Sequence, residues 1–321
     1  MSVTPAIYRK IALSALVALA IIIVTGALVR LTGSGLGCPD WPACSRSEFV
    51  DVSSGHRAIE QLNRVFTGLV AVAVIVAVLG SLVRVPRRKD LVLLSLGLVV
   101  GVIAQIVLGG ITVLTDLNPI AVQGHFALSI AILTDALVLH RRASEDGAPY
   151  RPAVPPHLRR WVLTAWALIG GAVLTGTVVT GTGPHGGDEH AHRFDFAISS
   201  VARVHSIVVL VATATLLLLA WRLRRGGGAW EVLGEPLTAL IVALVFQGAI
   251  GYTQYFNGVP VGLVAVHVVG AVVVWCLAAK LAFATRRSAA PGVLVADGTA
   301  NRERDGAPAA QSHSAGSGAV W

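Results

Sequence analysis

The stretch Ile59–Thr67, with the sequence IEQLNRVFT, places polar groups at the start of a long apolar run. A carboxylate, an amide and a guanidinium fall within five residues, at Glu60, Asn63 and Arg64. A charge in a membrane helix is costly, so a charged residue at such a position is a functional candidate.

A second copy of this stretch, VARVHSI, occupies Val201–Ile207. The two copies differ at two positions: Glu60 aligns with Ala202, and Asn63 aligns with His205. The chain therefore carries two related but chemically unequal sites.

The composition indicates an integral membrane protein. Of 321 residues, 55% are hydrophobic and only 13% are charged, and the mean hydropathy is +0.73. Soluble domains carry roughly 25% charged residues. The net charge of +8 is no sign of nucleic-acid binding, because Lys and Arg gather in the cytoplasmic loops of membrane proteins.

Eight segments are long and apolar enough to span a membrane, which takes about 20 residues each. The first is too long for the apolar core of a signal peptide and is interpreted as a retained helix. The predicted spans are 11–30, 62–83, 91–113, 120–139, 161–180, 198–221, 236–256 and 261–283.

The distribution of basic residues predicts the orientation. Alternate loops together with the N-terminal segment hold sixteen Lys and Arg, and the opposite loops and helix mouths hold six. The basic set is assigned to the cytoplasm, so both termini lie inside and the protein is expected in the cell membrane. Residues 286–321 are rich in Ala, Gly, Ser and Pro, and are predicted to form a disordered cytoplasmic tail.

The eight spans form two repeats. Gly26 to Gly33 matches Gly176 to Gly183, and a Gln precedes a His by twenty residues in both halves, at Gln105 and at Gln247. Four helices per unit give both units the same orientation, with a pseudo-twofold axis along the membrane normal. The predicted fold is all-α, with two parallel four-helix bundles. The units are 1–140 and 161–285, joined by a cytoplasmic linker at 141–160.

Three histidines lie inside spans near their outer ends: His125, His205 and His267. They lie five to seven residues past the expected helix starts, about 8–10 Å deep. Two imidazoles from neighbouring helices are a usual haem clamp, so His205 and His267 are predicted as axial ligands of a haem iron. A buried histidine bonded to a neighbour, or a Zn or Cu ligand, is the alternative.

The first unit has Asn63 and His125 at the equivalent positions, and Asn is a poor iron ligand. Glu60 lies one helical turn before Asn63, and His56 lies one turn further out on the same face. We predict that the second unit holds a permanent cofactor and that the first hosts chemistry, with Glu60 as the catalytic acid. The alternative for Glu60 is a structural ion pair with Arg57 or Arg64.

The outer loops carry the remaining candidates. Cys38 and Cys44 face the oxidising side, where a disulfide is favoured over a metal site, and a redox-active dithiol is a further option. A Gly-rich turn precedes three histidines, which form either a surface metal site or solvated loop residues: His185, His190 and His192.

Taken together, these motifs resemble the bacterial heme A synthases over roughly residues 11–283. The motifs that carry the resemblance are the CPDWPAC loop at 38–44, Glu60 before Asn63-Arg64, Leu117-Asn118-Pro119 before His125, Gly181 to His185, Arg203 before His205, and Gln254-Tyr255-Phe256 before His267.

The family oxidises a ring methyl of heme O to a formyl group, giving heme A for terminal oxidases. The resemblance implies heme b on His205 and His267, substrate heme O in the N-terminal unit, Glu60 as the essential acid, and a Cys38–Cys44 disulfide. It also implies handover of substrate from a heme O synthase, an electron acceptor of unknown identity, contact with membrane lipid and a possible homo-oligomer.

The chain departs from the family at Asn63, where many relatives have His. His125 then remains as an axial ligand of the substrate heme, with His56 as a second option. Two other classes of function stay open: a membrane b-type electron-transfer cytochrome without chemistry on its heme, and a parallel-repeat transporter.

Overall fold

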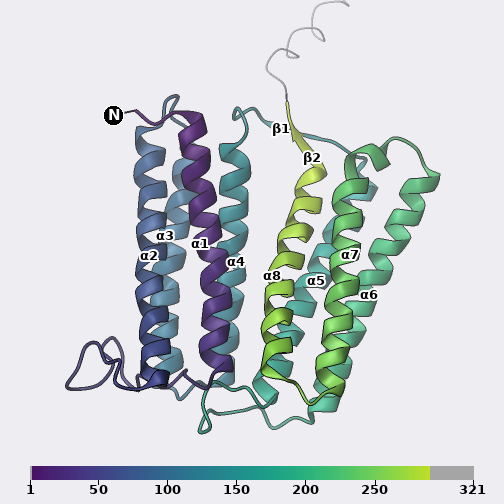
Figure 1. The fold of residues 1–321 in the computed structure, drawn as a ribbon. Helices are drawn as coiled ribbons and strands as arrows, with labels where there is room; N and C mark the ends of the chain where they lie inside the picture. The colour runs from purple at the N-terminus through teal and green to yellow at the C-terminus, as the bar shows by residue number, and fades with distance from the viewer. Residues whose placement is uncertain (1, 290–321) are drawn as a thin grey trace, which may run out of the picture. The chain divides into compact units, whose positions relative to one another are not determined.

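The computed structural model describes residues 2–289 and contains eight long helices and one short two-stranded sheet (Figure 1). All eight helices are long and apolar enough to cross a membrane, which confirms the predicted all-α membrane class. The elements are α1 (Pro5–Leu31), α2 (Gly55–Val83), α3 (Lys89–Leu114), α4 (Pro119–Ala143), β1 (Tyr150–Pro152), α5 (Pro156–Thr182), α6 (Ile198–Arg225), α7 (Ala229–Phe256), α8 (Val261–Ala284) and β2 (Arg286–Ser288).

Residues 290–321 of the predicted tail lie outside the described residues. The first residues assigned to that tail, Arg286–Ser288, form β2, which pairs antiparallel with β1 in the linker between the halves.

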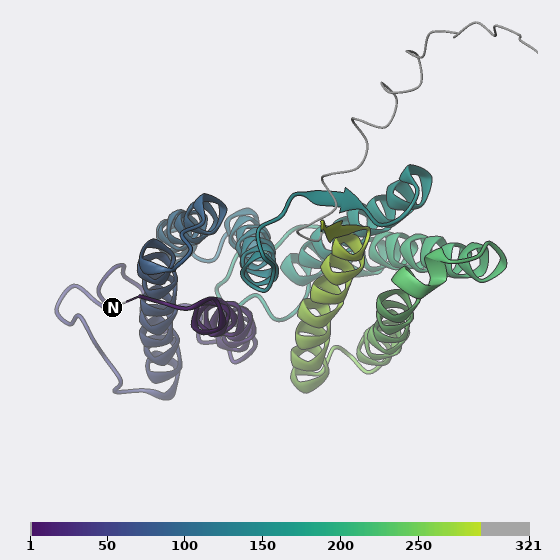
Figure 2. The same ribbon diagram turned by 90° about the horizontal axis from the view of Figure 1, so that it is seen from above.

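Within Met1–Ser288, which forms one compact unit, the helices make two four-helix bundles (Figure 2). In each bundle, successive helices contact one another and the first helix contacts the last, α1 with α4 and α5 with α8. The second and fourth helices of each bundle are therefore diagonal to one another, α2 to α4 and α6 to α8.

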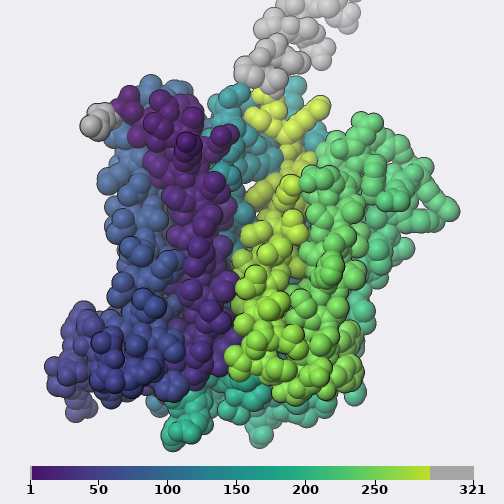
Figure 3. Space-filling model, viewed as in Figure 1, coloured from purple at the N-terminus to yellow at the C-terminus, as the bar shows by residue number. Residues whose placement is uncertain are grey.

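The bundles meet along α1, α4, α5 and α8 (Figure 3). The contacting pairs are α1 with α8, α4 with α5, and α4 with α8, a set that an exchange of the two halves would preserve. The pseudo-twofold axis itself stays a prediction. Two hydrogen bonds between side chains of the described residues cross this boundary: Trp275 Nε1 donates to Thr134 Oγ1 at 2.9 Å, and Gln123 Nε2 donates to Thr177 Oγ1 at 2.8 Å.

Each bundle has its own packed core, and a small cluster of Ile23, Leu133 and Val272 joins the two. The outward faces carry exposed large apolar side chains such as Val100 and Phe246. Lipid tails are as apolar as these side chains, so association of the helices depends on close packing and hydrogen bonds more than on transfer from water.

Local sequence explains where the helices begin. Ser54 Oγ accepts from the N–H of Arg57 at the start of α2, and Asn118 Oδ1 accepts from the N–H of Ile120 at the start of α4. Side chains of this kind satisfy backbone donors that the first turn leaves unpaired. Because Ser54 caps α2, the helix begins seven residues before the predicted 62, and Glu60 and Asn63 both lie inside it.

The helix α7 also begins seven residues earlier than predicted, at Ala229 instead of 236. The predicted start rests on apolar content alone, which falls in the segment before Pro236. In the structure the helix continues through Pro236, which is buried, and Glu231 lies in its first turn.

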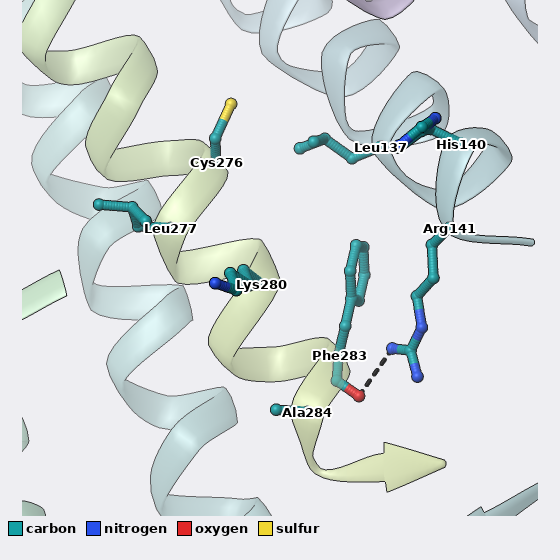
Figure 4. A pocket seen from close by; sticks show the side chains of 8 residues that line it. All are labelled: Leu137, His140, Arg141, Cys276, Leu277, Lys280, Phe283 and Ala284. Atoms are coloured by element: carbon teal, nitrogen blue, oxygen red, sulfur yellow. Dashed lines mark hydrogen bonds between the residues drawn. The ribbon is translucent and has the colours of Figure 1, made fainter. Parts of the chain in front are cut away.

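A cavity of about 510 Å³ lies between α4 and α8 (Figure 4). It is near the end of these helices where β1 and β2 are located. Leu137 and Cys276 point into it from the two helices. Arg141 closes its end by donating to the carbonyl oxygens of Phe283 and Arg286, both at 2.6 Å. This guanidinium therefore ties the first bundle to the end of the second.

Candidate functional site

The three predicted histidines lie near the same end of their helices. His125 is six residues after the start of α4, His205 seven after the start of α6, and His267 six after the start of α8. All three side chains are half-buried. The expectation that His205 and His267 come from neighbouring helices is wrong, because α6 and α8 are diagonal across the second bundle. A diagonal pair can still face the same bundle interior.

His125 and His267 are held by the same backbone contact in both halves. Gln105 Nε2 donates to the carbonyl oxygen of His125 at 3.1 Å, and Gln247 Nε2 donates to that of His267 at 2.7 Å. The repeated spacing of twenty residues between Gln and His therefore corresponds to a direct link between adjacent helices. It fixes the backbone from which each imidazole projects.

A glycine on the preceding helix lies against each of the three imidazole rings. A Cβ on Gly109 would lie 3.3 Å from His125 Cε1, and one on Gly251 would lie 3.2 Å from His267 Cε1. In the same way, a Cβ on Gly176 would lie 3.2 Å from His205 Cε1. A larger residue would have to displace the ring at each position, so these glycines permit the close approach.

The surroundings of His205 favour a metal-binding tautomer. Thr175 Oγ1 donates to the carbonyl oxygen of Gly171 at 2.9 Å and lies 3.1 Å from His205 Nδ1. The hydroxyl oxygen can therefore accept a hydrogen bond from Nδ1–H of His205, which leaves the lone pair on Nε2 available for a metal. Metal-binding histidines commonly fix the second ring nitrogen in this way.

The donor set fits a haem iron. Within residues 2–289, no protein group hydrogen-bonds Nε2 of His125, His205 or His267, while the Nδ1 atoms of His125 and His267 are buried without a partner. A ring nitrogen without a protein partner can donate its lone pair to a metal ion. No group of three or more His, Cys, Asp or Glu able to hold a metal occurs in the described part of the chain. The chemistry of these sites thus suits an iron that brings four nitrogen ligands of its own.

Glu60 is 5% exposed and both of its oxygens are engaged. The N–H of Cys38 donates to Oε2 at 2.7 Å, and Arg64 Nη2 donates to Oε1 at 2.7 Å. The ion pair with Arg64 was the alternative for this carboxylate. Arg57, the other possible partner, instead pairs with Asp51, and hydrogen bonds from Ser53 and Arg57 hold the pKa of Asp51 below its usual value.

Arg64 extends the contact from Glu60 across the outer loop. Its guanidinium donates to four backbone carbonyl oxygens at 3.1–3.3 Å, those of Cys38, Asp40, Pro42 and Ala43. Together, Glu60 and Arg64 hold the loop that contains the cysteines over the mouth of the first bundle. Any chemistry at Glu60 therefore takes place next to this loop.

Cys38 and Cys44 form the predicted disulfide, with 0% and 1% of their surfaces exposed. Because the sulfurs are buried, soluble thiols reach them only after the loop opens.

We expect Cys38→Ser to destabilise the loop by about 2 kcal/mol, the estimate for a loop this short. The measurement is thermal unfolding of the purified protein in detergent, with Cys276→Ser as the matched control outside the loop. Reduction of the native disulfide by glutathione without prior unfolding would contradict the structural role.

The other polar residues predicted on the face of α2 that carries Glu60 contact different parts of the structure. The Oδ1 atom of Asn63 is buried without a partner among the described residues. The hydroxyl of Thr67 donates to the carbonyl oxygen of Asn63 at 3.1 Å. His56 is exposed, and its Nδ1 lies 3.0 Å from Ser34 Oγ. His56 thus contacts the outer loop, two turns away from Asn63.

The outer-loop histidines do not gather at one place. His185 Nε2 lies 2.7 Å from the carbonyl oxygen of Val259, and His190 Nδ1 lies 3.3 Å from Asp188 Oδ1. His190 and His192 are exposed. These contacts favour the interpretation as loop residues over a surface metal site.

Two charged residues inside the spans were not among the predicted site residues: Asp135 was not noted, and Arg30 was counted only as one of the six basic residues of the outer side. Asp135 in α4 lies over Gly97 of α3, whose Cβ would be 2.7 Å from Oδ2, and no described residue forms an ion pair with it. Arg30 in the last turn of α1 packs its Cγ against Gly187, with no described ion pair. An acid within an apolar run, and a basic residue on the side poor in basic residues, were the signals that could have found them.

The fold and this site define a class: multi-pass membrane proteins built from two four-helix bundles with histidines at matching depth. The sequence matches the model of the family described as cytochrome oxidase assembly protein, over residues 9–54 and 47–184. These matches together span more than half of the chain, and the protein belongs to this family. The matched region includes Glu60, Asn63 and His125 but ends before His205.

Three relatives named heme A synthase align with part of the chain. That of Exiguobacterium sibiricum is 28% identical over 142 residues, 44% of this chain and 48% of the relative. That of Alkalihalophilus pseudofirmus is 30% identical over 128 residues, 40% and 43% respectively. That of Lysinibacillus sphaericus is 30% identical over 129 residues, 40% and 42%. The chain spans less than half the length of each of these relatives.

Proposed function

We propose that this protein is a heme A synthase, an oxidoreductase that converts the ring methyl of heme O to a formyl group. Membership of the cytochrome oxidase assembly family supports this function, as do the partial relatives that carry the name. The single observation that carries it from the structure is the inequality of the two bundles. One has two deep histidines, and the other has one deep histidine and a buried acid.

The second bundle is the proposed heme b site, with His205 and His267 as axial ligands. Thr175 orients the ring of His205, and Gln247 anchors the backbone of His267. A bound heme b would supply a one-electron carrier beside the reaction site. The residues around the site would bind this heme and orient its ligands.

The first bundle, residues 1–140, is the proposed substrate site, with His125 as the axial ligand of heme O. Glu60 stands at its mouth on the side of Asn63. Its carboxylate can stabilise positive charge that develops on the methyl carbon or accept a proton from an attacking water. The Arg64 guanidinium and the N–H of Cys38 hold the carboxylate in place for either role.

The same proposal places the protein in the cell membrane with both termini in the cytoplasm, because the sixteen basic residues lie on that side. The linker 141–160 and the residues after 285 are then cytoplasmic. The proposed partners are heme O, handed over by a heme O synthase, membrane lipid, an electron acceptor and a second copy of the chain.

Extraction of the bound hemes tests this function. When the protein is expressed with a heme O synthase in a bacterium that lacks its own heme A synthase, we expect heme A in the acid-acetone extract. The matched control is the same strain without this protein, which should contain heme O and heme B only. Heme B alone on the purified protein would favour an electron-transfer cytochrome, and a protein without heme would favour a transporter.

A further inference from the structure

The second bundle contains a contact set for one imidazole, formed by consecutive residues of α5. The hydroxyl of Thr175 lies 3.1 Å from Nδ1 of His205, and Gly176 lies against the edge of the same ring at Cε1. One residue fixes the tautomer and the other leaves room for the ring. We call Thr175 and Gly176 the imidazole socket of the second bundle.

The first bundle repeats the same two residues at the equivalent place in α1, as Thr25 and Gly26. Here the contacts differ. The hydroxyl of Thr25 donates to the carbonyl oxygen of Ile22 at 3.3 Å, and a Cβ on Gly26 would meet no described atom within 4 Å. The helix α1 thus keeps the socket residues although no imidazole of residues 2–289 packs against Gly26.

Asn63 explains the difference. It stands where His205 stands in the second bundle, and its side chain ends in an amide instead of a ring. Its Oδ1 atom is buried and has no hydrogen-bond partner among the described residues. A buried oxygen without a hydrogen bond is unfavourable, so this side chain is poorly matched to a closed, dry site.

His56 does not replace the missing ring. It lies seven residues before Asn63 on α2, about 10 Å further out along the helix. Its Nδ1 is 3.0 Å from the hydroxyl of Ser34 in the outer loop. The earlier option of His56 as a second ligand therefore has no support from the contacts in this structure.

We propose that the first bundle holds its heme through His125 alone, and that the socket of Thr25 and Gly26 makes the opposite axial position accessible to a small nitrogen ligand. The inference rests on the proposed function, because it takes the first bundle as the substrate site. A heme iron with one strong axial ligand is high-spin, whereas two imidazoles make it low-spin. The two hemes of one molecule are then distinguishable in a single spectrum.

One strong ligand also suits a substrate. A substrate heme must enter and leave, whereas a resident cofactor must stay. Losing one of two metal ligands weakens a site more than losing a supporting contact, which alone costs 10–100-fold in affinity. Asn63 therefore weakens the binding of heme in the first bundle, so that this heme can exchange. Heme binding in the second bundle is unaffected.

The test uses the purified full-length protein loaded with ferric heme, with imidazole alone as the probe. We expect a mixture of high-spin and low-spin signals in absorption and electron paramagnetic resonance spectra. Added imidazole should convert the high-spin part to low-spin. In Asn63→His the protein should be low-spin before imidazole is added, and its response to imidazole should fall at least tenfold.

A second variant keeps the inference testable if Asn63→His does not fold. Gly26→Val fills the socket at a position where a Cβ meets no described atom, so it should keep the high-spin heme and lose the imidazole response. Gly176→Val is the matched variant in the second bundle, where a Cβ would lie 3.2 Å from the ring of His205. It should instead reduce the low-spin signal.

His125→Ala separates failure of this inference from failure of the proposed function. If the heme content does not fall in His125→Ala, the first bundle does not bind heme through His125, and both the substrate site and the inference are wrong. If a His125-dependent heme is present but is fully low-spin and indifferent to imidazole in the unaltered protein, the substrate site stands and only the open position is refuted.

Discussion

Glu60→Gln is expected to lower the yield of heme A by roughly 10²-fold or more, the usual contribution of a positioned acid or base. Gln keeps the size of the side chain and can still accept from the N–H of Cys38, which lies 2.7 Å from Oε2. It loses the charge that would stabilise a cationic carbon or accept a proton. Heme b should stay bound, and heme O or a hydroxylated intermediate should accumulate.

The contacts of Glu60 dictate the control for this variant. Because the carboxylate forms an ion pair with Arg64, a loss of activity in Glu60→Gln alone does not separate chemistry from support of the loop. Arg64→Gln breaks the same ion pair but keeps the carboxylate, which the N–H of Cys38 still holds at Oε2. We expect Arg64→Gln to reduce the amount of folded protein and to lower heme A formation per molecule much less than Glu60→Gln does.

The measurement is the ratio of heme A to heme O in extracts, normalised to the heme b content of the purified protein. An equal loss in Glu60→Gln and Arg64→Gln would assign Glu60 a structural role in the outer loop. Normal heme A formation by Glu60→Gln would refute a catalytic role altogether.

Replacing His205 or His267 with Ala is expected to lower the low-spin b-heme absorbance by at least about tenfold, since even supporting contacts at a metal site are worth 10–100-fold in affinity. Either variant removes one of the two proposed axial ligands, which lie on diagonal helices of the second bundle. The heme that we propose for His125 should persist, because His125 lies in the other bundle.

His190→Ala serves as the control for both variants, because that imidazole is exposed in the outer loop and contacts only Asp188. The reduced-minus-oxidised spectrum of the purified protein, together with its heme content per chain, provides the measurement. An unchanged low-spin signal in both His205→Ala and His267→Ala would overturn the assignment of the ligands.

The number and type of the helices could be predicted from the chain because a membrane span requires a long apolar run, and eight such runs are present. Four helices begin five to seven residues before the starts predicted in this way: α1, α2, α5 and α7. Polar residues at the mouth of α2 and Pro236 in α7 both lower apolar content without ending a helix. A capping side chain such as Ser54 marks the true boundary, and apolar content does not register it.

The site was partly predictable for a different reason. A repeat lets one half of the chain serve as the reference for the other, so the exchange of His205 for Asn63 and of Ala202 for Glu60 is visible without a structure. Asp135 was missed, and Arg30 was used only to predict the orientation, because neither has a charged counterpart in that comparison. The diagonal placement of α6 and α8 was missed because loop length does not reveal how four helices close into a ring.

The sequence by itself determined the membrane class, the eight spans, the shared depth of the three histidines and the inequality of the two halves. These follow from composition and from spacing along single helices. Only the tertiary structure decided that Glu60 bonds the N–H of Cys38, twenty-two residues away, and that Thr25 and Gly26 keep a socket without a ring. Both depend on how helices and loops pack against one another. The hydrophobic periodicity of a single helix does not reveal which residues of other elements it contacts.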